Sequence, residues 1–219
     1  MGRGAEPDLG LLKHLDDFSG LGLHDDPLTV DDSIGIMRIV RDANRASEIV
    51  ERIRTLTKRT PLKHDPFNLN DVVLETIALT LSEIQRHDVS LRTELADDLP
   101  LVLGDRILLQ QIVLNLIINA IEAIVAAGDG SRELLVGTAT ETPDRVLLAV
   151  HDTGAGLSVE KPDRLFEAFY TTKPQGMGMG LAISRSIIEA HGGRIWAVPN
   201  EPRGAIFRFA LPIRRPEPY

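Results

Sequence analysis

The sequence predicts an α+β fold, a two-layer sandwich in which helices cover one face of a mixed, largely antiparallel sheet, with a long helix before it. Two observations lead to this prediction. Segments with the apolar period of a helix and segments with the alternation of a strand follow one another without strict β-α-β order. The chain has 219 residues, 43% of them hydrophobic, which is enough for one globular domain with an appendage.

Composition excludes several classes of function. The chain has no cysteine, so disulfides and thiolate metal sites are excluded. The net charge of −8 argues against nucleic acid as the main partner, because neutralising phosphates requires a basic face. No uninterrupted apolar run approaches the roughly 20 residues that cross a bilayer, and residues 1–10 are polar. We therefore expect no membrane segment in this chain and a cytoplasmic location.

The first 60 residues divide into two parts. Residues 1–30 are rich in glycine and acidic side chains, and Asp25-Asp26-Pro27 would stop a helix, so we expect this part to be poorly ordered. Over residues 31–60, apolar side chains recur at three- and four-residue steps and predict one long helix. Its narrow apolar stripe is typical of a helix that packs on another long helix, which would allow a homodimer. The alternative is a helix that lies on its own domain.

Residues 61–219 are predicted to form the main domain, with a linker over residues 61–66. Asp105 is expected to be the N-cap of the central helix, which ends before the glycines at 128 and 130. The predicted helices are Asn70–His87, residues 105–127, and the segment that starts near Leu181. The predicted strands are Val89–Glu94, Leu101–Leu103, Glu133–Thr140, Arg145–His151, Arg194–Val198 and Ala205–Leu211.

Three amides interrupt the apolar helix over residues 105–127. Gln111, Asn115 and Asn119 are four residues apart and therefore share one face. A buried amide without a partner costs about 1–3 kcal/mol, so the row needs an explanation. One explanation is hydrogen bonding to neighbouring backbone. For Gln111 this explanation and a functional role are equally favoured. For Asn119 we favour a ligand role, because an amide oxygen is a hard neutral donor that suits Mg²⁺.

Asp152 ends an apolar strand and is followed by Gly154 and Gly156. Two interpretations stay open. The aspartate is a turn residue, or its carboxylate accepts a hydrogen bond from the exocyclic amine of adenine and so discriminates against guanine. In the second case the two glycines would let the chain curl beneath the base.

The segment after it combines aromatic residues with a lysine. Phe166 and Phe169 are expected to anchor the ends of a mobile loop in the core. Lys173 is either a solvated surface lysine or a flexible point charge that meets a phosphate. The alternating glycines over residues 176–180 follow directly and open onto an amphipathic helix, whose first N–H groups form an anion site. There is no Gly-Lys-Ser/Thr, so the loop is not a P-loop.

Taken in order, these segments resemble the ATP-binding catalytic domain of bacterial sensor histidine kinases, in the superfamily that also holds gyrase B, heat-shock ATPase chaperones and mismatch-repair ATPases. The resemblance covers roughly residues 31–219 and implies a Bergerat-type ATP-binding fold. The short lid between Phe169 and Gly176 is similar to that of nitrogen- and oxygen-sensing kinases. The matching boxes are Gln110–Ala123, Asp152–Leu157, Leu165–Lys173, Gly176–Leu181 and Gly204–Pro212.

The resemblance implies a role for each box. Asn119, with Asn115, would hold the Mg²⁺ that bridges the ATP phosphates, and Asp152 would read adenine. Lys173 and the backbone at Gly178 and Gly180 would hold the β- and γ-phosphates. Asn119, Lys173 and Glu122 are the candidate catalytic residues. The implied nucleotide-binding residues are Asn115, Asn119, Asp152, Gly154, Gly156, Phe169, Thr172, Lys173, Gly176, Gly178, Met179, Gly180 and Leu181.

The sequence departs from the hydrolytic relatives at one position. Those relatives carry a water-activating Glu one helical turn before the Mg²⁺-binding Asn, and here that position is Asn115. Without this base, attack by water should be slow, and the γ-phosphate is kept for another acceptor. Glu122, three residues after Asn119, is a weaker candidate for a base or for a supporting role behind the ligands.

The second departure concerns the phosphate acceptor. Residues 31–60 resemble the second helix of the dimerisation hairpin that bears the acceptor histidine in this family. None of the six histidines of the chain stands in the expected motif. The sequence therefore predicts transfer from Mg-ATP to a histidine supplied in trans, by a hairpin domain or a full-length kinase partner, with a response regulator as the next partner. The alternatives are a serine kinase of the anti-sigma type and a non-catalytic nucleotide-dependent regulator.

Overall fold

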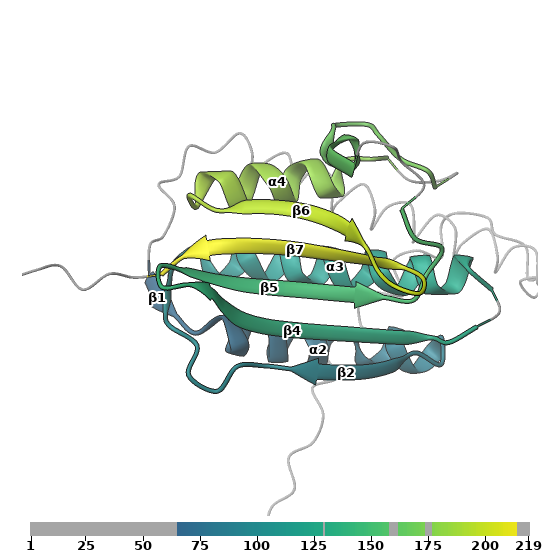
Figure 1. Ribbon diagram of the computed structural model, residues 1–219, viewed down its shortest axis with the longest axis horizontal. Coiled ribbons are helices and arrows are strands. Elements are labelled where there is room, and N and C mark those ends of the chain that lie inside the picture. The colour runs from purple at the N-terminus through teal and green to yellow at the C-terminus, as the bar shows by residue number, and fades with distance from the viewer. Residues whose placement is uncertain (1–64, 129, 158–161, 174–176, 214–219) are drawn as a thin grey trace, which may run out of the picture. The chain divides into compact units, whose positions relative to one another are not determined.

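A computed structural model of the protein describes residues 65–128, 130–157, 162–173 and 177–213 (Figure 1). The predictions for residues 1–30, for the helix over residues 31–60 and for Gly176 lie outside the described residues.

The centre of the fold is a five-stranded sheet with the strand order β2-β4-β5-β7-β6. Strand β2 runs parallel to β4, and every other neighbouring pair in this sheet is antiparallel. The predicted mixed, largely antiparallel sheet is therefore confirmed. The strands are β2 (Ser90–Glu94), β4 (Glu133–Thr142), β5 (Arg145–Asp152), β6 (Arg194–Pro199) and β7 (Ala205–Pro212).

Three α-helices accompany the sheet: α2 (Leu69–Arg86), α3 (Arg106–Ala126) and α4 (Gly180–Ala190). Figure 1 shows α2 and α3 behind the sheet, while α4 packs against α3 and β6. Asp105 is the N-cap of α3, as predicted, and its Oδ1 accepts hydrogen bonds from the backbone N–H groups of Ile107 and Leu108 at 3.0 and 3.2 Å. The central helix therefore begins where the sequence places it.

The core lies between the sheet and the helices. Alternate residues of neighbouring strands point inward in register, as with Val136, Val150 and Phe207, which stand side by side across β4, β5 and β7. The inner face of α3 packs onto this layer with fully buried residues such as Leu116 and Ile117. Among the described residues, one helix, α3, is long and apolar enough to cross a membrane. Its buried side chains form part of this core.

Two short elements were not predicted. Strand β1 (Asp65–Phe67) pairs antiparallel with β3 (Val102–Gly104), so the prediction of a linker over residues 61–66 is wrong for its last two residues. Three residues carry no period, and the pairing depends on Phe67 packing into the core. A 3₁₀ helix, η3 (Pro162–Phe166), follows β5 and buries Phe166.

Candidate nucleotide-binding site

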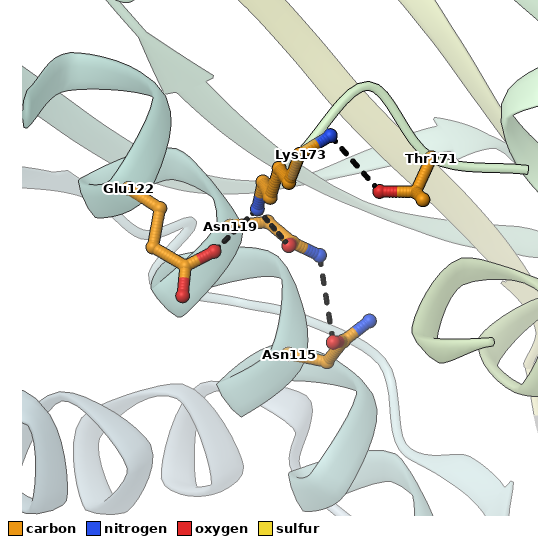
Figure 2. A network of polar contacts seen from close by, with 5 residues as sticks. All are labelled: Asn115, Asn119, Glu122, Thr171 and Lys173. Atoms are coloured by element: carbon orange, nitrogen blue, oxygen red, sulfur yellow. Dashed lines mark hydrogen bonds and ion pairs between the residues drawn. The ribbon is translucent and has the colours of Figure 1, made fainter. Parts of the chain in front are cut away.

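Two of the three predicted amides of α3, Asn115 and Asn119, form a row of hydrogen bonds. Asn119 Nδ2 donates to Asn115 Oδ1 at 3.4 Å, and both side chains are half-buried (Figure 2). Asn115 Nδ2 donates in turn to Ser184 Oγ on α4 at 3.1 Å. The row therefore bonds to side chains of the neighbouring helix rather than to nearby backbone.

Lys173 joins this row from the loop that follows η3. Its Nζ donates to Asn119 Oδ1 at 2.8 Å and forms an ion pair with Glu122 (Figure 2). The backbone N–H of Lys173 donates to Thr171 Oγ1 at 3.1 Å, which holds the loop in a local turn, and Thr172 beside it is exposed. The lysine is thus no isolated surface charge: Asn119, Glu122 and Lys173, the three candidate catalytic residues, are in contact.

Asp152 lies at the end of β5, where its side chain is 1% exposed. Its Oδ1 accepts hydrogen bonds from the backbone N–H groups of Gly154 at 2.8 Å and Ala205 at 3.3 Å. Its Oδ2 is buried, and no donor among the described residues reaches it. Burial raises the pKa of this carboxyl, and the two backbone hydrogen bonds oppose that rise. One oxygen therefore serves the turn, and the other suits a donor from a ligand.

The turn between β6 and β7 holds the loop after Asp152. Asn200 Nδ2 donates to the Asp152 carbonyl oxygen at 2.9 Å. Arg203 donates from Nε to the Gly154 carbonyl oxygen at 3.0 Å and from a guanidinium nitrogen to the Ala127 carbonyl oxygen at 3.2 Å, near the end of α3. Neither Asn200 nor Arg203 could be singled out from the sequence, because a turn rich in polar residues carries no local sign of the carbonyl groups that it contacts.

Gly154 brings this loop against α3. A Cβ at this position would lie 2.7 Å from the carbonyl carbon of Ala123, closer than packed side chains allow. Gly156 follows with a φ of 83°. The backbone beside Asp152 therefore rests directly on α3, one helical turn beyond Asn119.

The two phenylalanines differ. Phe166 is buried, and its ring meets that of Phe207 edge to face, with 6.5 Å between the ring centroids. Phe169 is 76% exposed, so the prediction that it anchors in the core is wrong. Its φ is 67°, and its N–H donates to the Gly178 carbonyl oxygen at 3.0 Å. Gly178 fits because a Cβ there would lie 2.6 Å from the carbonyl carbon of Phe169.

Helix α4 begins beside the amide row. Met179 is its N-cap and makes no side-chain cap hydrogen bond, so the first N–H groups of this helix receive no cap from that side chain. A Cβ at Gly180 would lie 2.7 Å from Asn115 Oδ1, and Leu181 packs partly on the core. The N-terminus of α4, Asn115, Asn119 and Lys173 thus converge, whereas the loop after Asp152 meets α3 one helical turn further along, at Ala123.

The described residues hold no cluster of three or more His, Cys, Asp or Glu side chains that could bind a metal ion. A cation in this part of the site would therefore depend on amide oxygens. The three described histidines lie at other positions in the fold. His87 is the C-cap of α2, His151 is a strand residue of β5, and His191 is the C-cap of α4. His191 is buried, and its Nε2 accepts from the Asp105 N–H at 2.9 Å.

The model of one protein family, described as "Histidine kinase-, DNA gyrase B-, and HSP90-like ATPase", matches residues 104–215, about half of the chain. The sensor protein FixL of Bradyrhizobium diazoefficiens is 41% identical over 187 residues, which is 85% of this chain and 37% of FixL. The sensor histidine kinase TmoS of Ectopseudomonas mendocina is 37% identical over 179 residues, 81% of this chain and 18% of TmoS. The chain therefore spans well under half the length of these relatives.

Solved structures of the histidine kinase ThkA are similar to this chain. Its catalytic domain superposes with a TM-score of 0.61 and 32% identity, over 69% of this chain and 96% of that domain. ThkA in complex with the response regulator protein TrrA gives a TM-score of 0.69 and 29% identity, over 93% of this chain and 57% of ThkA.

Proposed function

Because the chain belongs to the histidine kinase-, DNA gyrase B- and HSP90-like ATPase family, we propose that it binds Mg-ATP and transfers the γ-phosphate to a histidine on a separate hairpin domain or full-length kinase. The observation that carries this proposal is the arrangement along α3. The loop of Asp152 rests on Ala123, whereas Lys173 meets Asn119, and four residues of helix correspond to roughly 6 Å. An ATP molecule that lies along α3 would have adenine at Asp152 and phosphates at Asn119 and Lys173.

Adenine recognition rests on Asp152. Its Oδ2 is buried and lacks a donor among the described residues, and the exocyclic amine of adenine would supply one. Because Oδ1 is held by backbone N–H groups, the carboxylate keeps its orientation. Guanine presents a carbonyl oxygen at the same place, so the two acceptors would oppose each other. The site should therefore prefer ATP to GTP.

Asn119 and Asn115 are the residues that would hold magnesium. The fit is supported by Asn119 Oδ1, a hard neutral oxygen that already accepts a cation, the Lys173 ammonium. Magnesium, when bound, would neutralise phosphate charge. Lys173 would then leave Asn119 and bind the β- and γ-phosphates. The N-terminus of α4, with Gly178, Met179 and Gly180, would face the same phosphates. Exposed side chains can make such an exchange at little cost.

Transfer itself is in-line displacement at phosphorus. The acceptor imidazole nitrogen forms the N–P bond, the bond from phosphorus to the β–γ bridging oxygen breaks, ADP leaves with that electron pair, and the imidazole N–H proton is released. The residues of this chain contribute position and charge. With Asn115 where hydrolytic relatives have a Glu, we expect water to compete poorly. The ion pair of Glu122 with Lys173 favours a role in holding the lysine over a role as a base.

The partners follow from the same proposal. The solved complex of ThkA with the response regulator protein TrrA supports a response regulator as the next acceptor. We further propose that residues 31–60 form the helix through which two copies associate, and that the protein acts in the cytoplasm.

One experiment tests the transfer. The protein is incubated with γ-labelled ATP, alone and with a histidine-bearing hairpin domain, and the labelled product is treated with acid. We expect acid-labile label on the hairpin only. Acid-stable label would instead identify a serine kinase, and nucleotide binding without any transfer would identify a regulatory module. Either of those outcomes overturns the histidine kinase assignment.

A further inference from the structure

Ser184 lies in the second turn of α4 and is 2% exposed. Its Oγ–H donates to the Gly180 carbonyl oxygen at 3.0 Å. A hydroxyl has one proton, so a lone pair faces Asn115, and Oγ accepts from Asn115 Nδ2 at 3.1 Å. The hydroxyl therefore selects the nitrogen of the Asn115 amide and excludes its oxygen from this position.

The orientation of the Asn115 amide in turn fixes the orientation of the Asn119 amide. With Nδ2 held by Ser184, the Asn115 Oδ1 faces Asn119 and accepts from its Nδ2 at 3.4 Å. Asn119 Oδ1 is then the atom that faces Lys173 Nζ at 2.8 Å, as Figure 2 shows. The reverse orientation would present an N–H group to a cation, which is repulsive. The direction of both amides is thus determined at α4, where Ser184 bonds to Asn115 one helical turn before Asn119.

We propose that Ser184 is a positioning residue for the magnesium site, because through Asn115 it fixes the amide of Asn119 with its oxygen toward the cation. This inference rests on the proposed function. It assigns Ser184 no contact with nucleotide or metal. It also links two parts of the phosphate site, since Gly180, which accepts from Ser184, is the first residue of α4 and lies beside Asn115.

The expected effect is on metal affinity. Groups that orient metal ligands typically contribute 10- to 100-fold to the affinity for the metal. Without the hydroxyl, Asn115 loses its acceptor and can turn over, so that Asn119 Oδ1 no longer has one fixed direction. Ser184→Ala should therefore reduce the gain in nucleotide affinity that Mg²⁺ provides by about tenfold.

The test is calorimetric titration of the full chain with AMPPNP, once with Mg²⁺ and once with EDTA. Ser184→Ala should lose affinity in Mg²⁺ and keep it in EDTA, and Ser184→Thr, which retains the hydroxyl, should behave as the unchanged protein does. Ser186→Ala is the matched control. Ser186 lies on the same helix and donates to the Ala182 carbonyl oxygen at 3.1 Å, but it is exposed and this bond does not involve the amide row.

Two results would overturn the proposal for Ser184: an unchanged gain from Mg²⁺ in Ser184→Ala, or an equal loss in Mg²⁺ and EDTA, which indicates a change in α4 as a whole. Ser184→Cys provides a second variant of similar volume, and its weak thiol acceptor should give an intermediate loss in Mg²⁺ alone. If the wild-type protein binds AMPPNP equally well with and without Mg²⁺, the magnesium site itself is overturned. Failure of the Ser184 proposal and failure of the proposed function are therefore distinguishable.

Discussion

The two ends of the proposed nucleotide site are held in different ways. At the adenine end, Asp152 is buried and its Oδ1 is fixed by backbone N–H groups of two segments. At the phosphate end, Lys173 and Glu122 are 41% and 53% exposed in their side chains and bond to side chains. In the proposed complex, the base would therefore be met by a group whose position is part of the core, and the phosphates would be met by groups that can change partner.

This difference has an energetic side. A buried carboxylate oxygen without a donor carries its full desolvation cost, so a ligand that supplies the donor recovers free energy. An exposed ion pair is well solvated and usually contributes at most about 1 kcal/mol, so breaking it costs little. Specificity for the base should consequently be strong, and the group that provides it should be rigid. Each phosphate contact should be weaker, and the groups that make these contacts should be mobile.

Asp152→Asn should have the largest effect. The new amide can still accept from the Gly154 N–H through its oxygen, but its nitrogen would face the amine of adenine as a second donor. A hydrogen bond to a charged group contributes about 1.5–3 kcal/mol, so ATP affinity should fall at least tenfold and up to about 100-fold. Titration with ATP and with GTP measures this change, and the preference for ATP should shrink, because the amide can donate to the carbonyl of guanine.

Asp163→Asn is a suitable control, since that residue lies in η3 and its carboxyl is not part of the loop after β5. An Asp152→Asn protein that binds ATP as tightly as the unchanged chain would contradict the adenine assignment.

Lys173→Ala should have the next largest effect, about tenfold on ATP affinity, because it removes one charge-assisted contact in an exposed place. The loss should be smaller for AMP, which lacks the β- and γ-phosphates. The free energy of unfolding should change by less than about 1 kcal/mol, as urea titration can measure. Arg92→Ala removes a comparable surface cation from β2 and should change neither quantity. Equal losses for ATP and AMP would show that Lys173 does not meet the terminal phosphates.

The stability of the nucleotide-free protein should depend on the protonation of Asp152. Burial raises the pKa of its carboxyl in the folded state, so the folded state binds more protons than the unfolded state between the two pKa values. Stability from this group is therefore complete below the ordinary aspartate pKa and declines as pH rises through the raised one. Urea unfolding of the unchanged chain and Asp152→Asn across this range should show the difference between them changing in that direction. A difference independent of pH would contradict it.

Much of the fold could be predicted because its signals are local. The apolar period and the capping Asp105 define α3 within the chain, and alternation with turn residues defines β4 and β5. The parallel pairing of β2 with β4 and the strand order could not be predicted, since they depend on how distant segments pack. Strand β1 was missed for the same reason: its three residues form a strand only because β3 lies beside them.

The site divides in a similar way. Asn119, Asp152 and Lys173 could be proposed as site residues from residue type and motif, but whether Asp152 is a turn residue or a ligand stayed open. In the structure, Oδ1 accepts a hydrogen bond within the turn, and Oδ2 has no donor among the described residues. Each interpretation therefore accounts for one of the two oxygens. Ser184 and Arg203 were missed, since their partners lie on other elements. Phe169 was placed in the core by its residue type, but it is exposed and its φ is positive.

The smallest effect is expected at Glu122, and it decides between the two roles that the sequence left for this residue. If Glu122 only holds Lys173, Glu122→Gln should free the lysine and change ATP affinity and transfer to the hairpin by about threefold or less, as for an exposed pair. If Glu122 is a general base, transfer should fall by about 10²- to 10⁴-fold while ATP affinity stays the same. Labelled-phosphate transfer measured beside ATP titration separates these outcomes, with Glu167→Gln, a similarly exposed carboxylate paired with Arg164, as the control. We expect the small change, because the contact that the structure gives Glu122 is its ion pair with Lys173.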